Sequence, residues 1–436
     1  MKFKCPDKWQ LVRLRELGEV NRGRSRHRPR YAEHLYGGAY PFIQTGDVKA
    51  SNGKITQHSQ TYSEAGLAQS RLWPAGTMCI TIAANIAETG ILAFPACFPD
   101  SVVGFIADPK KANTAFVEYM FRFIRVQIQS QASGTAQDNI NLKTLDRLHF
   151  PLPPLPTQRA IASVLGTLDD LIELNRETNE ILEEMARALF KSWFVDFDPV
   201  RAKLEGRPPA GMDAATAALF PDHFQDSELG QIPKGWENAT IGEVCEINSW
   251  TLGKSDKLES LEYVEISEVN RGNIANMATY HRGDEPSRAR RRLRHGDTVL
   301  STVRPNRGAY FLALNPPANR VASTGFAVLT PSKTPWSFVH AAMTQPEISD
   351  HLGHLADGGA YPAVRPEIIS AIEVVIPNSS AVLDAFHQVC APLFEMTESN
   401  RIESRDLATL RDALLPKLLS GEVSVCEAAS RLEEAR

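Results

Sequence analysis

Two clusters of arginines have the composition and spacing of a nucleic-acid contact. In residues 22–30 an arginine occupies every second position and alternates with Gly, Ser, His and Pro. This alternation predicts an extended loop, or an edge strand that would place the arginines on one side. Residues 288–295 hold five arginines and a histidine. Guanidinium groups match phosphate oxygens and guanine edges with paired hydrogen bonds, so both clusters favour nucleic acid over a solvated loop or a site for an acidic protein.

Several common catalytic and metal-binding motifs are missing from the sequence. It contains no G-x-x-x-x-G-K-[ST] phosphate loop, no H-E-x-x-H and no G-x-S-x-G, and its six cysteines form no C-x-x-C pair or zinc spacing. Residues 315–318 (NPPA) are similar to the N-P-P-[YF] loop of adenine amino methyltransferases, in which the aromatic residue stacks on a flipped base. The fourth residue here is Ala318 and no Gly-rich cofactor loop precedes it, so a turn is favoured.

The charges are divided unevenly along the chain. Its 436 residues are 43% hydrophobic and 23% charged, which is ordinary globular composition, and the formal net charge is −5. Residues 1–150 carry 19 basic and 12 acidic side chains, whereas residues 151–230 carry 7 and 14. The net charge is −1 over residues 231–377 and −4 over residues 378–436. Basic charge is therefore gathered in the globular parts of the chain and acidic charge in the helical parts.

One plan occurs twice in the chain. Matching segments such as residues 42–48 and 263–269, and residues 76–81 and 296–301, keep one order and an offset of 220–227 residues. The framework repeats mostly hydrophobic residues and glycine, while the polar loops differ, as in SNGK at 51–54 against RGN at 271–273. Two domains that recognise different nucleic-acid sequences would share a framework in this way and differ in their polar loops.

Each copy consists of a globule followed by a long helix. Short β-rich runs separated by Gly, Pro and Asn, such as residues 77–82 and 298–303, indicate a mixed α/β globule. Apolar residues then recur every three or four positions, which predicts a coiled-coil seam rather than an ordinary amphipathic helix. Polar residues fall in the middle of each seam and would fix its register; they are Asn175, Asn179, Asn400 and Glu403.

These patterns define the predicted architecture. The fold class is α+β, with two similar mixed α/β globular domains separated by two long antiparallel coiled-coil helices in a pseudo-two-fold repeat. No signal peptide or membrane span is indicated, so we expect a cytoplasmic protein. The predicted divisions are a globular domain at 1–152, a helical region at 153–198, a linker at 199–230, a second globular domain at 231–376 and a second helical region at 377–436.

Three segments carry a resemblance to a known family. They are GTAQDNI at 134–140, PLPPLPTQRAI at 151–161 and ALFKSWFVDFDP at 188–199. Together with the order of globules and helices, they resemble the specificity (S) subunit of type I restriction-modification enzymes, over essentially the whole chain. The resemblance implies a non-catalytic subunit whose two globules are target recognition domains, each reading one half of a bipartite DNA target.

The resemblance also implies partners and cofactors. The helices would set the spacing of the half-sites and dock two methyltransferase (M) subunits, and motor-nuclease (R) subunits would complete the enzyme. S-adenosylmethionine, ATP and Mg²⁺ would then belong to those subunits, with no cofactor or metal on this chain. The alternatives are a DNA methyltransferase with its own active site, and a coiled-coil scaffold without a DNA role.

The candidate DNA-binding residues come from the arginine clusters and from the polar tips of both globules. In the first globule they are Arg22, Arg24, Arg26, Arg28, Asn52, Lys54, Asn85, Gln137 and Asn139. In the second globule they are Arg288, Arg290, Arg291, Arg304, Asn306, Arg307, Tyr361 and Arg365.

Overall fold

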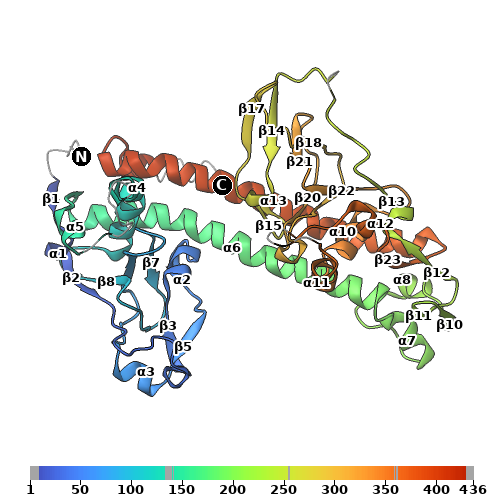
Figure 1. Ribbon diagram of the computed structural model, residues 1–436, viewed down its shortest axis with the longest axis horizontal. Helices are drawn as coiled ribbons and strands as arrows, with labels where there is room; N and C mark the ends of the chain where they lie inside the picture. The colour runs from blue at the N-terminus through green and yellow to red at the C-terminus, as the bar shows by residue number, and fades with distance from the viewer. Residues whose placement is uncertain are drawn as a thin grey trace. The chain divides into compact units, whose positions relative to one another are not determined.

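The computed structural model divides the chain into two units, and each unit contains part of both long helices (Figure 1). It describes residues 9–428 except 133–139, 141, 254–255, 358 and 360–361. Unit 1 comprises Met1–Glu173 and Ser404–Arg436, and unit 2 comprises Leu174–Glu403.

Unit 1 is built on a five-stranded sheet covered by a helix. The strand order is β2-β8-β6-β7-β4, and every neighbouring pair is antiparallel except the parallel pair β4 and β7. Helix α4 packs on the sheet through Phe116 and Met120, which share a core with Met78 and Phe105 of the strands. The elements are β1 (Gln10–Val12), α1 (Leu14–Leu17), β2 (Gly18–Arg22), η1 (Glu33–Leu35), β3 (Tyr36–Phe42), α2 (Thr45–Ala50), β4 (Gly53–Ile55), β5 (Gln60–Tyr62), α3 (Glu64–Ala68), β6 (Met78–Thr81), β7 (Thr89–Leu92), β8 (Val102–Ala107), α4 (Thr114–Ala132), α5 (Leu142–Arg147) and β9 (Phe150–Leu152).

Unit 2 contains two four-stranded sheets, ordered β13-β22-β19-β20 and β17-β14-β21-β18. An aromatic cluster that includes Phe194, Trp236, Phe338 and Phe386 joins its helices to its strands. Its elements begin with α7 (Asp198–Leu204), α8 (Ala214–Ala218), β10 (Phe224–Ser227), β11 (Gly230–Pro233), β12 (Trp236–Thr240), α9 (Ile241–Val244), β13 (Cys245–Ile247), β14 (Ser260–Val264), η2 (Ile266–Glu268), β15 (Val269–Asn270), β16 (Asn273–Ile274) and β17 (Ala278–His281). They continue with β18 (Ala289–Arg292), β19 (Asp297–Ser301), η3 (Pro305–Arg307), β20 (Tyr310–Ala313), β21 (Arg320–Ser323), β22 (Phe326–Pro331), α10 (Trp336–Met343), α11 (Pro346–His354), α12 (Pro366–Ser370) and β23 (Glu373–Pro377).

Equivalent strand pairs close the two globules. In unit 1, β1 pairs with β9 and is antiparallel to it, and in unit 2, β12 and β23 pair in the same way. Both pairs join the start of a globule to the residues just before a long helix. The pairs β1–β9 and β12–β23 therefore correspond to each other in the repeat that the sequence shows.

The two predicted long helices are α6 (Leu155–Phe194) and α13 (Ser380–Ser420). Pro156 lies in the first turn of α6, where its missing N–H is not needed. Within unit 2, α6 runs antiparallel to α13, because Asn179 contacts Thr397 while Phe190, further along α6, contacts Phe386. In unit 1, Leu165 of α6 and Leu418 of α13 are buried in one core. The predicted pair of long antiparallel helices is confirmed.

The segment 199–230 has more structure than the predicted linker. It contains most of α7, all of α8 and the strand β10, which pairs with β11. Val200 and Phe220 are buried in the core of unit 2. These scattered apolar side chains have no helical or strand period, so their burial by a distant surface was invisible in the sequence.

Candidate nucleic-acid interface

The arginine loop, residues 23–32, follows β2 in unit 1 as an extended segment rather than a strand. Other parts of the unit hold its backbone: Gln69 Oε1 accepts hydrogen bonds from the N–H groups of Arg26 (2.5 Å) and His27 (2.9 Å). Ser70 Oγ donates to the Arg24 carbonyl (2.8 Å), and Arg30 forms an ion pair with Asp100 (2.9 Å). Other residues of unit 1 therefore hold the loop in place.

The arginines of this loop differ in their freedom to bind. Arg22, Arg24 and Arg26 are exposed, and in the described part of the chain their guanidinium groups have neither a hydrogen bond nor an ion pair. Arg28 donates to the carbonyls of Ser25 and His27, both at 2.8 Å, so it folds back on the loop. Three of the four predicted arginines thus have unpaired cations to offer a phosphate.

Tyr31 is a surface residue that the sequence analysis missed. It lies beside Arg30 in the turn that ends the arginine loop, and 78% of its surface is exposed. An exposed aromatic ring among arginines can stack on a base or pack against a sugar. An aromatic residue next to an alternating arginine run was the available signal.

The other described candidates of unit 1 lie on strand β4 and in the turns beside the strands. Asn52 precedes β4, is exposed and has a positive φ of 46°, while Lys54 lies on β4, 3.9 Å from Asp170 of α6. Asn85 is exposed in the connection from β6 to β7, and its carbonyl accepts a hydrogen bond from Thr81. Gln137 and Asn139 lie outside the described residues. DNA contact by these side chains stays a prediction.

Carboxylates of unit 2 neutralise much of its arginine cluster. Arg290 pairs with Glu285 (3.2 Å), and Arg292 pairs with Asp256 (2.6 Å) while its guanidinium stacks 3.9 Å from the Trp250 ring. Glu285 is only five residues from Arg290, whereas Asp256 is 36 residues from Arg292 and is brought to strand β18 by the fold.

Arg291 and Arg288 differ from their paired neighbours. Nε of Arg291 is buried without a hydrogen-bond partner among the described residues, and burial lowers the pKa of its guanidinium. Arg288 is exposed next to β18. Arg288 is thus the predicted member of this cluster whose charge is most open to solvent.

The remaining candidates of unit 2 border η3 and α12. Asn306 and Arg307 are exposed on η3, Arg304 precedes it with a φ of 48°, and Arg365 is the exposed residue before α12. Tyr361 lies outside the described residues. The residues of η3 and Arg365 belong to segments that meet, because the amide of Arg304 donates to the carbonyl of Pro362 (2.8 Å).

The NPPA segment forms the turn between β20 and β21. Asn315 is exposed with a φ of 45°, and its backbone N–H donates to His295 Nδ1 (3.3 Å). This confirms the interpretation as a turn. Among the residues that the structure describes, no group of three or more His, Cys, Asp or Glu side chains is arranged to hold a metal ion.

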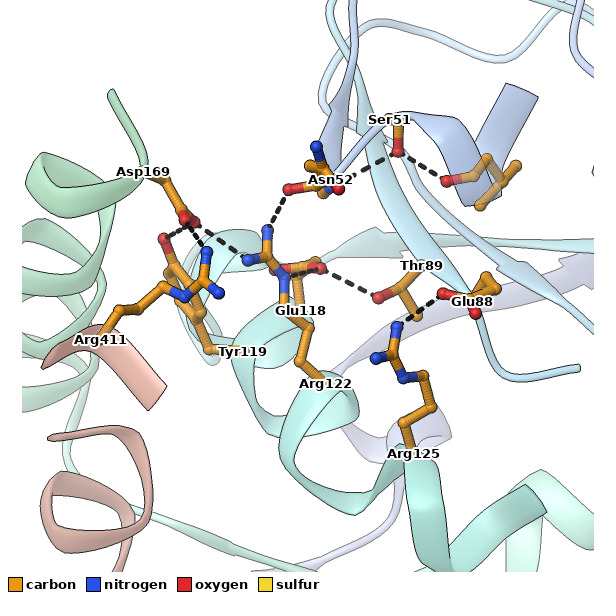
Figure 2. Close-up of polar contacts among 12 residues, drawn as sticks. Ser51, Asn52, Glu88, Thr89, Glu118, Tyr119, Arg122, Arg125, Asp169 and Arg411 are labelled. Atoms are coloured by element: carbon orange, nitrogen blue, oxygen red, sulfur yellow. Dashed lines mark hydrogen bonds and ion pairs between the residues drawn. The ribbon is translucent and has the colours of Figure 1, made fainter. Parts of the chain in front are cut away.

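A buried polar network supports the Asn52 turn (Figure 2). Arg122 of α4 donates from Nη2 to the Asn52 carbonyl (2.7 Å), from Nε to Glu118 (2.6 Å) and from Nη1 to Asp169 of α6 (3.1 Å). Arg411 of α13 donates to the other oxygen of Asp169 (2.7 Å). The network joins the globule of unit 1 to its parts of both long helices.

The charges in this network depend on one another. Burial raises the pKa of Glu118, which Arg122 opposes. Burial would lower the pKa of Arg122, but Glu118 and Asp169 outweigh it and raise that pKa. Tyr119 donates its hydroxyl to Asp169 (2.7 Å), and burial together with this carboxylate raises the pKa of Tyr119. Removing one member would leave a buried group without its partner.

Comparison with known proteins places these features in context. Residues 6–184 match the family model described as "Type I restriction modification DNA specificity domain". The chain is 28% identical to the Haemophilus influenzae type I restriction enzyme HindI specificity subunit, an alignment that covers 73% of this chain and 80% of that one. It is 24% identical to the Methanocaldococcus jannaschii MjaIX specificity subunit, with 97% of this chain and 95% of that one covered.

A solved structure shares the fold. The S subunit of a type I restriction-modification system from M. genitalium aligns with a TM-score of 0.56 and 17% identity, and the alignment covers 96% of this chain and 99% of that one. This alignment confirms the α+β fold with two long helices. The family match and the sequence relatives confirm the resemblance stated from the sequence. No helix in the described part of the chain is long and apolar enough to cross a membrane.

Proposed function

We propose that this protein, a relative of type I restriction enzyme specificity subunits along its whole length, is the subunit that reads the DNA sequence for such an enzyme. Each globule would read one half of a bipartite target. The observation that carries this proposal is the repeat: two globules closed by equivalent strand pairs, β1–β9 and β12–β23, present different polar residues. Two independent readers on one scaffold would differ in this way.

In unit 1 the arginine loop is the proposed centre of DNA contact. Its backbone is already held by Gln69 and Ser70, so binding would cost little ordering entropy. Arg22, Arg24 and Arg26 are exposed cations, and charge-assisted hydrogen bonds to phosphates are among the stronger polar contacts.

Protein partners would bind the long helices. In unit 2, apolar side chains of both helices face solvent, including Leu174, Ile181 and Met185 of α6 and Val389 and Met396 of α13. Exposed apolar side chains on an acidic helical region indicate that the helices bind a protein rather than DNA. We propose that methyltransferase subunits dock there, that motor-nuclease subunits join them, and that S-adenosylmethionine, ATP and Mg²⁺ act on those partners in the cytoplasm.

Exchange of one globule tests the proposed function. Residues 1–152 would be replaced by the equivalent globule of a related chain, and modified bases would be sequenced in a host that also makes the methyltransferase partner. One half of the methylated target should change and the other half should stay. A change in both halves would contradict independent reading.

A salt titration tests the arginine loop. Replacing Arg24 and Arg26 by Ala should weaken DNA binding and flatten the salt dependence by roughly one unit of slope for each phosphate that the variant no longer binds. Arg207→Ala is the matched control, because Arg207 is an exposed arginine far along the sequence whose partner is Glu205. An unchanged salt slope would place the arginine loop away from DNA. Binding of S-adenosylmethionine by the purified chain alone would favour a methyltransferase instead.

The helices are also proposed to set the distance between the half-sites. One heptad inserted in phase in each helix, near Asn179 and near Glu403, lengthens each by about 10 Å, or about three base pairs of DNA. The insertion variant should methylate the same half-sites with a longer spacer. Methylation at the original spacer would exclude this role and leave the helices as docking surfaces.

A further inference from the structure

We propose that Arg122 and Arg401 are positioning residues, one in each unit, that tie an equivalent glycine-containing turn of the globule to helix α6. The turns are Asn52-Gly53 in unit 1 and Arg271-Gly272 in unit 2, which lie in the SNGK and RGN segments that face each other in the sequence repeat. The consequence for DNA reading rests on the proposed function, whereas the tie itself does not.

Arg122 makes three kinds of contact in unit 1 (Figure 2). It binds Glu118 one turn earlier on its own helix (2.6 Å), Asp169 of α6 (3.1 Å) and the carbonyl of Asn52 (2.7 Å). Its side chain is only 19% exposed and that of Glu118 is 2% exposed. The bonds to the two carboxylates are therefore partly shielded from water, where charge-assisted hydrogen bonds are strongest, whereas the bond to the Asn52 carbonyl lies at the surface.

Arg401 makes the same three kinds of contact in unit 2. It pairs with Glu398 on its own helix (3.8 Å), forms an ion pair and hydrogen bond with Glu183 of α6, and donates to the carbonyl of Arg271 (3.4 Å). Its side chain is 12% exposed. The two arginines belong to different helices, α4 and α13, so they are not copies of one residue in the repeat.

Both turns are shaped to receive the guanidinium. Asn52 and Arg271 have φ of 46° and 43°, and the glycines that follow have φ of 98° and 82°. A Cβ atom on Gly53 would lie 2.7 Å from Cζ of Arg122, and a Cβ on Gly272 would lie 2.7 Å from Cζ of Arg401. Only glycine lets the arginine lie against the turn while the backbone keeps a positive φ.

The contacts of Arg122 and Arg401 fix the position of a polar turn in each globule. In unit 1 the turn connects α2 to β4; it carries the candidate DNA residue Asn52 and precedes the candidate Lys54 on β4. In unit 2 the turn connects β15 to β16 and presents the exposed side chain of Arg271. Loss of one arginine should free one turn and leave the other unit unaffected.

The test replaces each arginine in the full-length chain, expressed with its methyltransferase partner. Arg122→Met and Arg401→Met keep the length of the side chain and remove its donors, while the corresponding Lys variants keep the charge but not the fork of donors. Arg125→Met and Arg176→Met are controls. Arg125 of α4 pairs with Glu88 and Arg176 of α6 pairs with Glu180, and neither ion pair involves the two turns. Hydrogen exchange is measured by mass spectrometry over residues 51–55 and 270–274.

Two measurements distinguish the contacts of Arg122 and Arg401 from the proposed function. Hydrogen exchange tests whether these contacts hold the turns, and sequencing of methylated targets tests whether the turns matter for DNA recognition. Arg122→Met should speed exchange at residues 51–55 only and reduce discrimination in one half of the methylated target by about tenfold. Arg401→Met should act on residues 270–274 and on the other half, the Lys variants should fall between Met and wild type, and the controls should change neither.

Unchanged exchange at both turns in folded Met or Lys variants would overturn the inference, as would equal loss of discrimination in both halves. Faster exchange in a protein whose wild type reads no DNA would instead support the tie and reject the proposed function. If the Met variants do not fold, the Lys variants and Gly53→Ala and Gly272→Ala carry the same two measurements.

Discussion

The buried Asn179 in the helix pair of unit 2 should be coupled energetically to Asn400. Asn179 is 8% exposed. Its Nδ2 donates to the carbonyl of Thr397 (3.1 Å), and its Oδ1 accepts from Asn400 Nδ2 (2.8 Å). Asn179→Leu breaks both bonds and leaves the Asn400 amide facing an apolar side chain.

The expected size follows from these bonds. Two hydrogen bonds contribute about 0.5–1.5 kcal/mol each, and an unsatisfied buried amide costs about 1–3 kcal/mol. Burial of the new leucine side chain stabilises the folded state by about 1.5–3 kcal/mol. Asn179→Leu should therefore lower the free energy of unfolding by about 1–2 kcal/mol, and Asn400→Leu by about 1 kcal/mol. The double variant has no orphan amide and gains two apolar side chains, so it should be at least as stable as wild type.

Urea unfolding followed by circular dichroism at 222 nm measures this cycle. The coupling free energy should be about 2 kcal/mol or more, with the double variant more stable than either single variant. The matched pair Asn175 and Glu403, joined at 3.0 Å but partly exposed, should show much weaker coupling. Additive effects at Asn179 and Asn400 would refute the reasoning, because they would mean that the two amides do not satisfy each other.

Three further predictions concern packing, recognition and pH. Gly104→Ala should lower the free energy of unfolding by about 1–3 kcal/mol, measured by thermal melting, because its Cβ would lie 2.6 Å from the fully buried Trp73 ring. Gly325→Ala should lower the melting temperature less, because its close contact is with the flexible end of the Ile266 side chain. Tyr31→Ala should weaken DNA binding about fivefold or more in a gel shift and Tyr31→Phe should retain it, since stacking needs the ring and not the hydroxyl; equal affinity for Ala and wild type would remove Tyr31 from the interface. Burial lowers the pKa of His340 to about 3, against 6.5 for an exposed histidine. The native state therefore binds fewer protons than the unfolded state between those values, so stability should fall as pH drops below 6.5, and His340→Asn should lessen the fall in urea midpoint between pH 7 and pH 5.

Local sequence patterns predicted the helices and strands because the spacing of apolar side chains within a segment indicates which of its positions are buried. The seam of α6 and α13 was readable from apolar spacing, and strands such as β6 and β19 from short β-branched runs between turn residues. The folded segment 199–230 was not readable, because Phe220 finds its partners in the tertiary core and not in neighbouring residues.

The candidate nucleic-acid interface, too, was predictable from the sequence only in part. The sequence by itself determined the two-fold plan, the helices and the arginine clusters, since hydrophobic period and charge are properties of contiguous residues. Tertiary structure alone decided which arginines are free: it leaves Arg24 exposed, pairs Arg292 with Asp256, and places Arg122 between Asp169 and the Asn52 turn. These partners are 36 to 70 residues apart in sequence. No local pattern encodes such distances, because an ion pair forms wherever folding brings two charges together and removes the water between them.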